Sequence, residues 1–323
     1  MQQWTQGLIV SLCVAIKTSN VAAEQFPTEP TLTELGWIAS DVEVLPVLTG
    51  EPGECLRAPD SESEKYLVEI GRAAFRSPML LGGQAARRGL SCQSCHINGH
   101  DNPAFFIQAL SGAPGTADVT SSVFSKARED NVFNPVTIPS LVGIAGKDAF
   151  GTKSPAPSIH VFVKDAVMDE FQGARPPGAV LKGLVAYISH LERASCSTSL
   201  ALRNVKKDMN DIGRIIDATL SALRRNDLET ADFLVVSAQS ALGHVNERFS
   251  GAELGKQREA LRRLSADLAG VRRTFKTNPA AGLEALKPIK SQLSDLTEDL
   301  HTHRRRSLYD VGVLRAALEA AEQ

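Results

Sequence analysis

Before Cys196, apolar residues recur every three or four positions in two stretches, a spacing typical of amphipathic helices. The first stretch, 61–75, opens with a Ser-x-x-Glu capping box and carries its apolar residues on one face. A second stretch, 177–192, has a proline at its start, where the first turn of a helix tolerates it. Between them Gly, Pro, Ser and Asn are frequent, so we expect mostly loops, with short helical pieces near 102–110 and 158–172.

Beyond Cys196 the helical spacing is almost continuous. Apolar stripes lie at 202–223, 228–245 and 254–275, a fourth helix is expected to start at Asn278 and Pro279, and the spacing also allows a fifth at 307–321. Short connections between consecutive helices favour antiparallel neighbours. The predicted fold class is therefore all-α, and residues 197–323 are predicted to form an up-and-down helical bundle.

The first 60 residues lack this periodicity. Residues 1–23 contain an apolar run that is too short to span a bilayer and end in small residues, which is typical of a secretory signal peptide. A disordered or buried N-terminus is the alternative. Residues 24–60 are rich in Pro, Glu and Thr and are expected to form an extended arm. We therefore expect export to the periplasm and no transmembrane segment in the mature chain.

The net charge of the chain limits the classes of macromolecule that it is expected to bind. The formal net charge is −2, so the chain lacks the basic surplus that nucleic acids attract, and we expect no nucleic-acid partner. Residues 24–196 carry 14 Lys and Arg against 20 Asp and Glu, whereas residues 197–323 carry 20 against 17. The opposite signs would favour docking of the bundle on the preceding residues or on an acidic protein partner, although solvated helix faces are the simpler explanation.

The most specific pattern is Cys-x-x-Cys-His, formed by Cys92, Cys95 and His96. Two thiols at this spacing can bond to the two vinyl groups of a haem, and the adjacent imidazole can then bind the iron. Structural zinc would need a second close pair of ligands, and a thioredoxin-like motif would follow a strand. The sequence predicts one covalently bound haem c per chain, attached to both cysteines, with His96 as an iron ligand.

The motifs around this site follow an order similar to that of a known family. They are IGRAAFRSPMLLGG, SCQSCHINGHDNP, VFNPVTIPSLVGIAG, SIHVFVKDAVMDEF and LKGLVAYISHL. This order resembles a class I cytochrome c domain, closest to the haem domains of the bacterial di-haem cytochrome c peroxidase and MauG family, over roughly residues 66–192. The resemblance implies a haem domain at 61–196 whose first and last helices cross through Gly71, with Phe75 and Tyr187 beside the crossing.

Two departures from that family leave the function open. The family carries two haems, and here there is one Cys-x-x-Cys-His; AFGTKS at 149–154 replaces the family's aromatic-His-Asp-Gly stretch. The leading hypothesis is a periplasmic mono-haem cytochrome that exchanges single electrons with a periplasmic or membrane-bound redox protein. The alternative is a peroxidase-like haem oxidoreductase with an open iron position, in which Asp169 and Glu170 could accept protons.

The resemblance also suggests what surrounds the iron. It places a methionine near Met168, which becomes the candidate distal ligand, with His160 and His190 as rivals and a packing role as the alternative. The Pro103 carbonyl is a candidate acceptor for the second ring nitrogen of His96. The candidate apolar walls are Phe105, Phe106, Phe124, Phe133 and Ile138.

Two further cysteines flank the predicted haem domain. Cys55 and Cys196 lie at its two ends, and the helix crossing implied by the resemblance would bring those ends together. An oxidising compartment permits a disulfide. We therefore predict a Cys55–Cys196 disulfide, with two unpaired buried thiols as the alternative.

Overall fold

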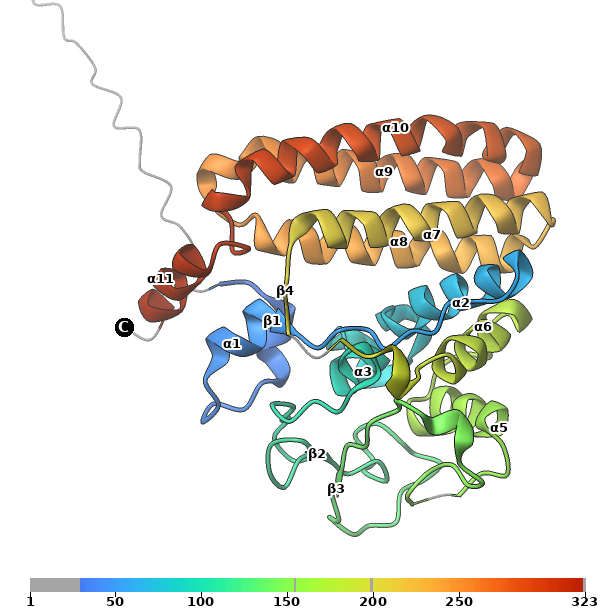
Figure 1. The fold of residues 1–323 in the computed structure, drawn as a ribbon, viewed down its shortest axis with the longest axis vertical. Helices are drawn as coiled ribbons and strands as arrows, with labels where there is room; N and C mark the ends of the chain where they lie inside the picture. The colour runs from blue at the N-terminus through green and yellow to red at the C-terminus, as the bar shows by residue number, and fades with distance from the viewer. Residues whose placement is uncertain (1–29, 154, 198–199, 322–323) are drawn as a thin grey trace, which may run out of the picture.

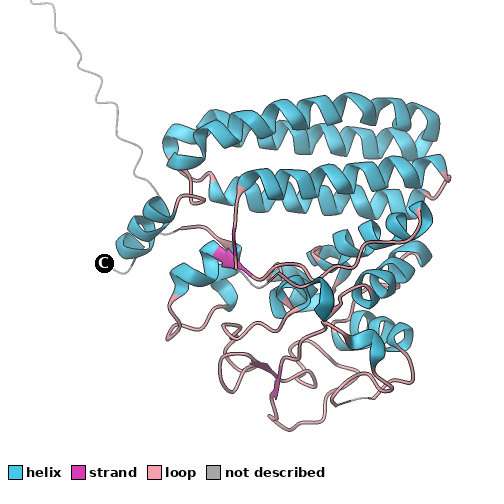
Figure 2. Ribbon diagram, in the orientation of Figure 1, coloured by secondary structure: helices cyan, strands magenta, loops and turns pink. Residues whose placement is uncertain are grey.

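The computed structural model describes residues 30–153, 155–197 and 200–321, so the predicted signal peptide lies outside the described residues. Helices account for 61% of the structure and strands for 5%, which confirms the all-α class (Figure 2). The helices are α1 (Val44–Thr49), α2 (Glu62–Phe75), α3 (Gly83–Arg87), α4 (Cys92–Cys95), α5 (Ile159–Asp165), α6 (Gly178–Ser189), α7 (Val205–Arg224), α8 (Leu228–Arg248), α9 (Gly255–Thr277), α10 (Pro279–His303) and α11 (Val311–Ala321). Within the described ranges, none of them combines the length and apolar character needed to cross a membrane.

Short strands form two small antiparallel ribbons. The strands are β1 (Gly50–Glu51), β2 (Thr116–Ala117), β3 (Val136–Thr137) and β4 (Ala201–Leu202). β1 pairs with β4, with Gly50 opposite Leu202, and β2 pairs with β3, with Thr116 opposite Thr137. The first ribbon ties the segment before α2 to the segment that leads into α7.

Helices α7 to α10 form the predicted up-and-down bundle (Figure 1). A side-chain oxygen caps the first turn of three of them, and α10 begins at Pro279, as the sequence predicts. Asn204 accepts from the backbone of Lys207, and Asn278 accepts from Ala281. Asp227 caps α8 in the same way. The 3₁₀ turn that precedes α9 has no side-chain cap.

The bundle packs directly on the preceding residues. α7 and α8 lie between α9 and α10 on one side and α2 and α6 on the other (Figure 1). One continuous buried apolar cluster runs from α2 and α6 into all four bundle helices. Ion pairs cross the same boundary, with Arg203 2.6 Å from Glu34 and Arg214 3.5 Å from Glu69. The opposite charges of the two parts therefore meet at this boundary.

α2 and α6 cross at two glycines. A Cβ on Gly71 would lie 1.9 Å from the Gly183 carbonyl oxygen, so the backbones touch where neither residue has a side chain. One turn along, the rings of Phe75 and Tyr187 pack with their centroids 5.2 Å apart. The Tyr187 hydroxyl donates to Glu54, 2.7 Å away. The crossing and its two aromatic neighbours are those expected from the sequence.

Residues expected to form an extended arm are partly helical. They contain a 3₁₀ helix at Thr33–Trp37 as well as α1. α11, the helix allowed at 307–321, packs beside α1 and not within the bundle (Figure 1). A separate apolar cluster joins the two ends of the described chain, and it contains Leu32, Leu48, Leu308 and Leu314.

Cys55 and Cys196 form a disulfide, which confirms the predicted pairing. The backbone brings them together independently of the sulfur bond. Leu56 pairs with Leu191 in an antiparallel bridge, and the Glu192 amide donates to the Cys55 carbonyl over 2.8 Å. The segment before α2 and the segment after α6 thus run side by side.

Candidate functional site

The Cys-x-x-Cys-His motif occupies a single helical turn. Cys92 begins α4 and Cys95 ends it, and side chains three positions apart on a helix lie on the same side. Ser91 and Ser94 cap the turn reciprocally. The His96 amide donates to the Cys92 carbonyl over 2.8 Å, so the histidine continues directly from the turn.

A tight left-handed turn holds the motif against the rest of the protein. Asn98 has φ +51° and Gly99 has φ +86°. The Asn98 side chain donates to the Pro52 carbonyl and accepts from Arg76, at 2.9 and 2.8 Å. The sequence pattern does not mark Asn98, although asparagine is one of the few residues that adopt this conformation readily.

The motif faces an apolar cavity of about 280 Å³, which we call the motif cavity. Its size is close to the lower end of the roughly 300–1,000 Å³ typical of small-molecule sites. Three of the expected walls, Phe105, Phe124 and Ile138, line it. Phe106 and Phe133 are not among the lining residues, and Phe133 is largely exposed.

His96 is oriented by a backbone carbonyl. Its Nδ1 lies 3.0 Å from the Pro139 carbonyl oxygen, so the acceptor is Pro139 and not Pro103. A proton on Nδ1 for this bond leaves Nε2 unprotonated and able to bind a metal. Burial lowers the pKa of His96 to about 4, against an opposing contribution from this hydrogen bond, so the ring is neutral at neutral pH.

Both motif cysteines are free thiols. Burial raises the pKa of Cys92 to about 12 and raises that of Cys95 as well, because the surrounding protein disfavours a thiolate. Their partial exposure is to the motif cavity, which they line. The cavity therefore presents two uncharged thiols and one uncharged imidazole.

A buried ion pair also lines the motif cavity. Glu170, at the end of a π-helical turn over Ala166–Glu170, accepts from Arg128 at 2.6 Å. Burial raises the pKa of Glu170 to about 7, although Arg128 opposes the shift. Of the two candidate proton acceptors predicted from the sequence, Glu170 is buried, whereas Asp169 is exposed. Arg128 was missed, because nothing in its loop marks it.

Met168 does not line the motif cavity. Its neighbours Ala166, Val167 and Glu170 do, while the Met168 side chain packs, partly buried, against the core. The rival ligands also lie elsewhere, with His160 exposed and His190 bonded to Glu64 at 3.0 Å. Among the described residues, no methionine lines the motif cavity together with His96.

Comparisons with known proteins identify no relative of this chain. No protein-family model matches the chain, and neither a curated protein nor a solved structure matches it.

Proposed function

We propose that the chain is a mono-haem c-type redox protein, with thioether bonds from Cys92 and Cys95 and the iron bound by Nε2 of His96. One observation carries the proposal: both thiols and the imidazole face the same apolar cavity, and Pro139 already occupies Nδ1 of the imidazole. Export to the periplasm belongs to the same proposal, because disulfides such as Cys55–Cys196 form and persist mainly in oxidising compartments.

The remaining cavity residues fit this group. The apolar walls suit a porphyrin face, and three cationic side chains, Arg128, Lys147 and Lys153, also line the cavity and could pair with its carboxylates. A bound haem supplies one-electron redox chemistry. The chain's own contribution is to orient His96, to keep water from it, and to raise the reduction potential through apolar burial.

The main function proposed is exchange of single electrons with a periplasmic or membrane-bound redox protein. The outer helices of the bundle, α9 and α10, lie on the side away from α2 and α6 (Figure 1). The prediction of a further protein partner concerns the bundle as a whole, and these outer helices are the part of it that does not pack on α2 and α6.

A second candidate is a peroxidase-like oxidoreductase. It is supported by the absence of a methionine from the described lining of the motif cavity and by the Glu170–Arg128 pair there. A carboxyl group with a pKa of about 7 can accept and return a proton near neutral pH. The Arg128 guanidinium lies 2.6 Å from this carboxyl group. A methionine-ligated electron carrier needs neither property.

Absorption spectroscopy of the exported protein tests both the covalent attachment of haem and the choice between the two candidate functions. A Cys92→Ala/Cys95→Ala variant should lose covalent haem, whereas Cys55→Ala/Cys196→Ala should keep it as the matched control. Retention of covalent haem by the first variant would refute the attachment. A low-spin ferric iron that is inert to peroxide identifies the electron carrier. High-spin iron that reacts with peroxide, and reacts more slowly in Glu170→Gln, identifies the peroxidase-like enzyme.

A further inference from the structure

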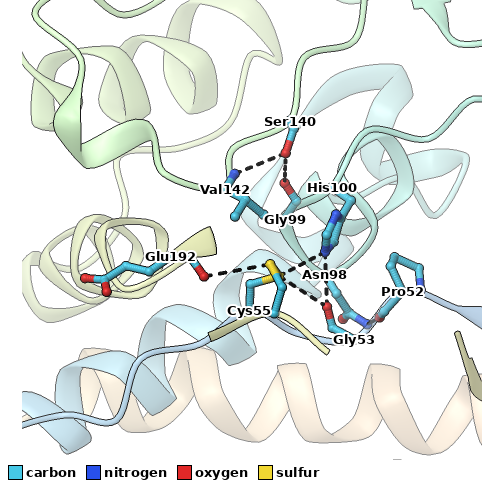
Figure 3. Close-up of a disulfide and its surroundings, with 10 residues drawn as sticks. Pro52, Gly53, Cys55, Asn98, Gly99, His100, Ser140, Val142 and Glu192 are labelled. Atoms are coloured by element: carbon cyan, nitrogen blue, oxygen red, sulfur yellow. Dashed lines mark hydrogen bonds between the residues drawn. A yellow bond between two sulfur atoms is a disulfide. The ribbon is translucent and has the colours of Figure 1, made fainter. Parts of the chain in front are cut away.

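A second group of metal-binding side chains lies outside the motif cavity, where the segments flanking α2 and α6 meet. It consists of Cys55, Cys196 and His100, which we call the junction cluster. Nε2 of His100 lies 3.3 Å from Sγ of Cys55 (Figure 3). The two sulfur atoms and this nitrogen all lie within 4.8 Å of one another.

The backbone holds the junction cluster together without the sulfur bond. Hydrogen bonds join the two cysteine-bearing segments at Cys55 and just after it, from the Glu192 amide to the Cys55 carbonyl and from the Arg57 amide to the His190 carbonyl, each 2.8 Å long. The β1–β4 ribbon continues the pairing. Cleavage of the disulfide would therefore leave two thiols facing each other.

His100 is also placed by the backbone. Its amide donates to the Ile97 carbonyl over 2.9 Å, and its Nε2 lies 3.1 Å from the Gly53 carbonyl oxygen. The same oxygen is 3.8 Å from Sγ of Cys55. Figure 3 shows the ring directed at the sulfur and at this carbonyl. An oxygen donor thus accompanies the two sulfur atoms and the nitrogen.

We propose that the junction cluster is a zinc site in its disulfide-bonded, metal-free form. A dithiol reductant would donate two electrons and two protons to the sulfur bond, giving two thiols and becoming a disulfide itself. Zn²⁺ would then displace the two thiol protons and bind both thiolates. His100 would bind through Nε2, with its proton on Nδ1, and the Gly53 carbonyl or a water would complete four ligands.

The observed geometry is close to what zinc requires. Zn–S bonds of about 2.3 Å and Zn–N bonds of about 2.0 Å in a tetrahedron place sulfur and nitrogen about 3.5 Å apart. The 3.3 Å between Cys55 and His100 is near that separation, so the sulfur atoms need only move apart after reduction. Two thiolates and an imidazole favour zinc over calcium or magnesium, which prefer oxygen ligands.

The test measures bound zinc on the folded, full-length exported protein before and after reduction by a dithiol. Wild type should hold one more zinc per chain when reduced than when oxidised, counted by elemental mass spectrometry after gel filtration. Cobalt should give a thiolate-to-metal absorption band under the same conditions. Cys55→Ser/Cys196→Ser keeps Cys92 and Cys95, so it reports any zinc held at the haem motif and separates this site from the proposed function.

His100→Ala provides the sharper variant, because it leaves the disulfide and the fold's hydrogen-bonded segments in place. It should lose the additional zinc, while His160→Ala, at an exposed residue, should keep it. Equal zinc in the reduced and oxidised wild type would overturn the proposal. Undiminished zinc binding by His100→Ala, or a reduced protein that unfolds and does not refold with zinc, would overturn it as well.

Discussion

Gly71 and Gly183 are in direct backbone contact where α2 crosses α6, and the carbonyl oxygen of Gly183 occupies the place of a Cβ on Gly71. The contact sets the position of both helices, and residues of both line the motif cavity. An alanine at position 71 cannot be accommodated by a side-chain rotation, because the obstructing atom belongs to the backbone.

We therefore predict that Gly71→Ala lowers the free energy of unfolding by more than about 3 kcal/mol. Urea titration followed by circular dichroism measures it. Gly178→Ala is the matched control, since nothing lies within 4 Å of a Cβ at the start of α6, and its stability should stay near that of wild type. Wild-type stability in Gly71→Ala would show that the helices do not cross as described.

Glu34 links the segment before α2 to the bundle. Its carboxylate lies 2.6 Å from Arg203 and 2.7 Å from Arg248. Burial alone would raise its pKa, but the two guanidinium groups outweigh burial and lower the pKa from 4.5 to about 2. The unfolded chain thus binds the Glu34 proton more tightly than the folded protein does.

It follows that Glu34 contributes stability above pH 4.5 and loses it as the pH falls from 4.5 towards 2. The contribution is at most about 3 kcal/mol. Wild type should be more stable than Glu34→Gln at pH 7, and the difference should shrink below pH 4.5 in denaturant titrations. Glu298→Gln, which removes an exposed partner of Lys206, should leave stability unchanged. A pH-independent difference would contradict the ion-pair explanation.

Substitution of Met168 tests which side chains face the motif cavity. Because its side chain lies outside the cavity lining, Met168→Ala should leave the ferric absorption spectrum and the reduction potential of the haem-loaded protein unchanged. Glu170→Gln, at a residue that does line the cavity, should shift the pH dependence of the potential. If Met168→Ala alone altered the spectrum, the result would instead support Met168 as an iron ligand.

Local sequence was sufficient for the long helices, and tertiary contacts explain where it failed. Apolar spacing and helix-start residues such as Asn278 and Pro279 predict the bundle, because both act within one or two turns. The helical part of residues 30–60 was not predicted. α1 is stabilised by contact with α11, whose Leu314 packs in the same cluster as Leu48. A local sequence pattern cannot predict a contact between residues so far apart in the chain.

Local sequence likewise predicts some features of the candidate site and not others. Spacing alone brings Cys92, Cys95 and His96 onto one turn. The carbonyl of Pro139 could not be predicted, because every residue carries a carbonyl and the fold decides which one reaches His96. The wider π-helical turn after α5 determines that Glu170, and not Met168, lines the motif cavity. An ordinary α-helical pattern gives no sign of that turn.

The central claim is that a haem is covalently attached to Cys92 and Cys95, and the intact mass of the exported protein measures it most directly. Under denaturing conditions the mass should exceed that of the processed polypeptide by one haem, and Cys92→Ala/Cys95→Ala should show the polypeptide mass alone. A wild-type protein with no covalent adduct, expressed where haem attachment to other proteins proceeds, would contradict the proposed function.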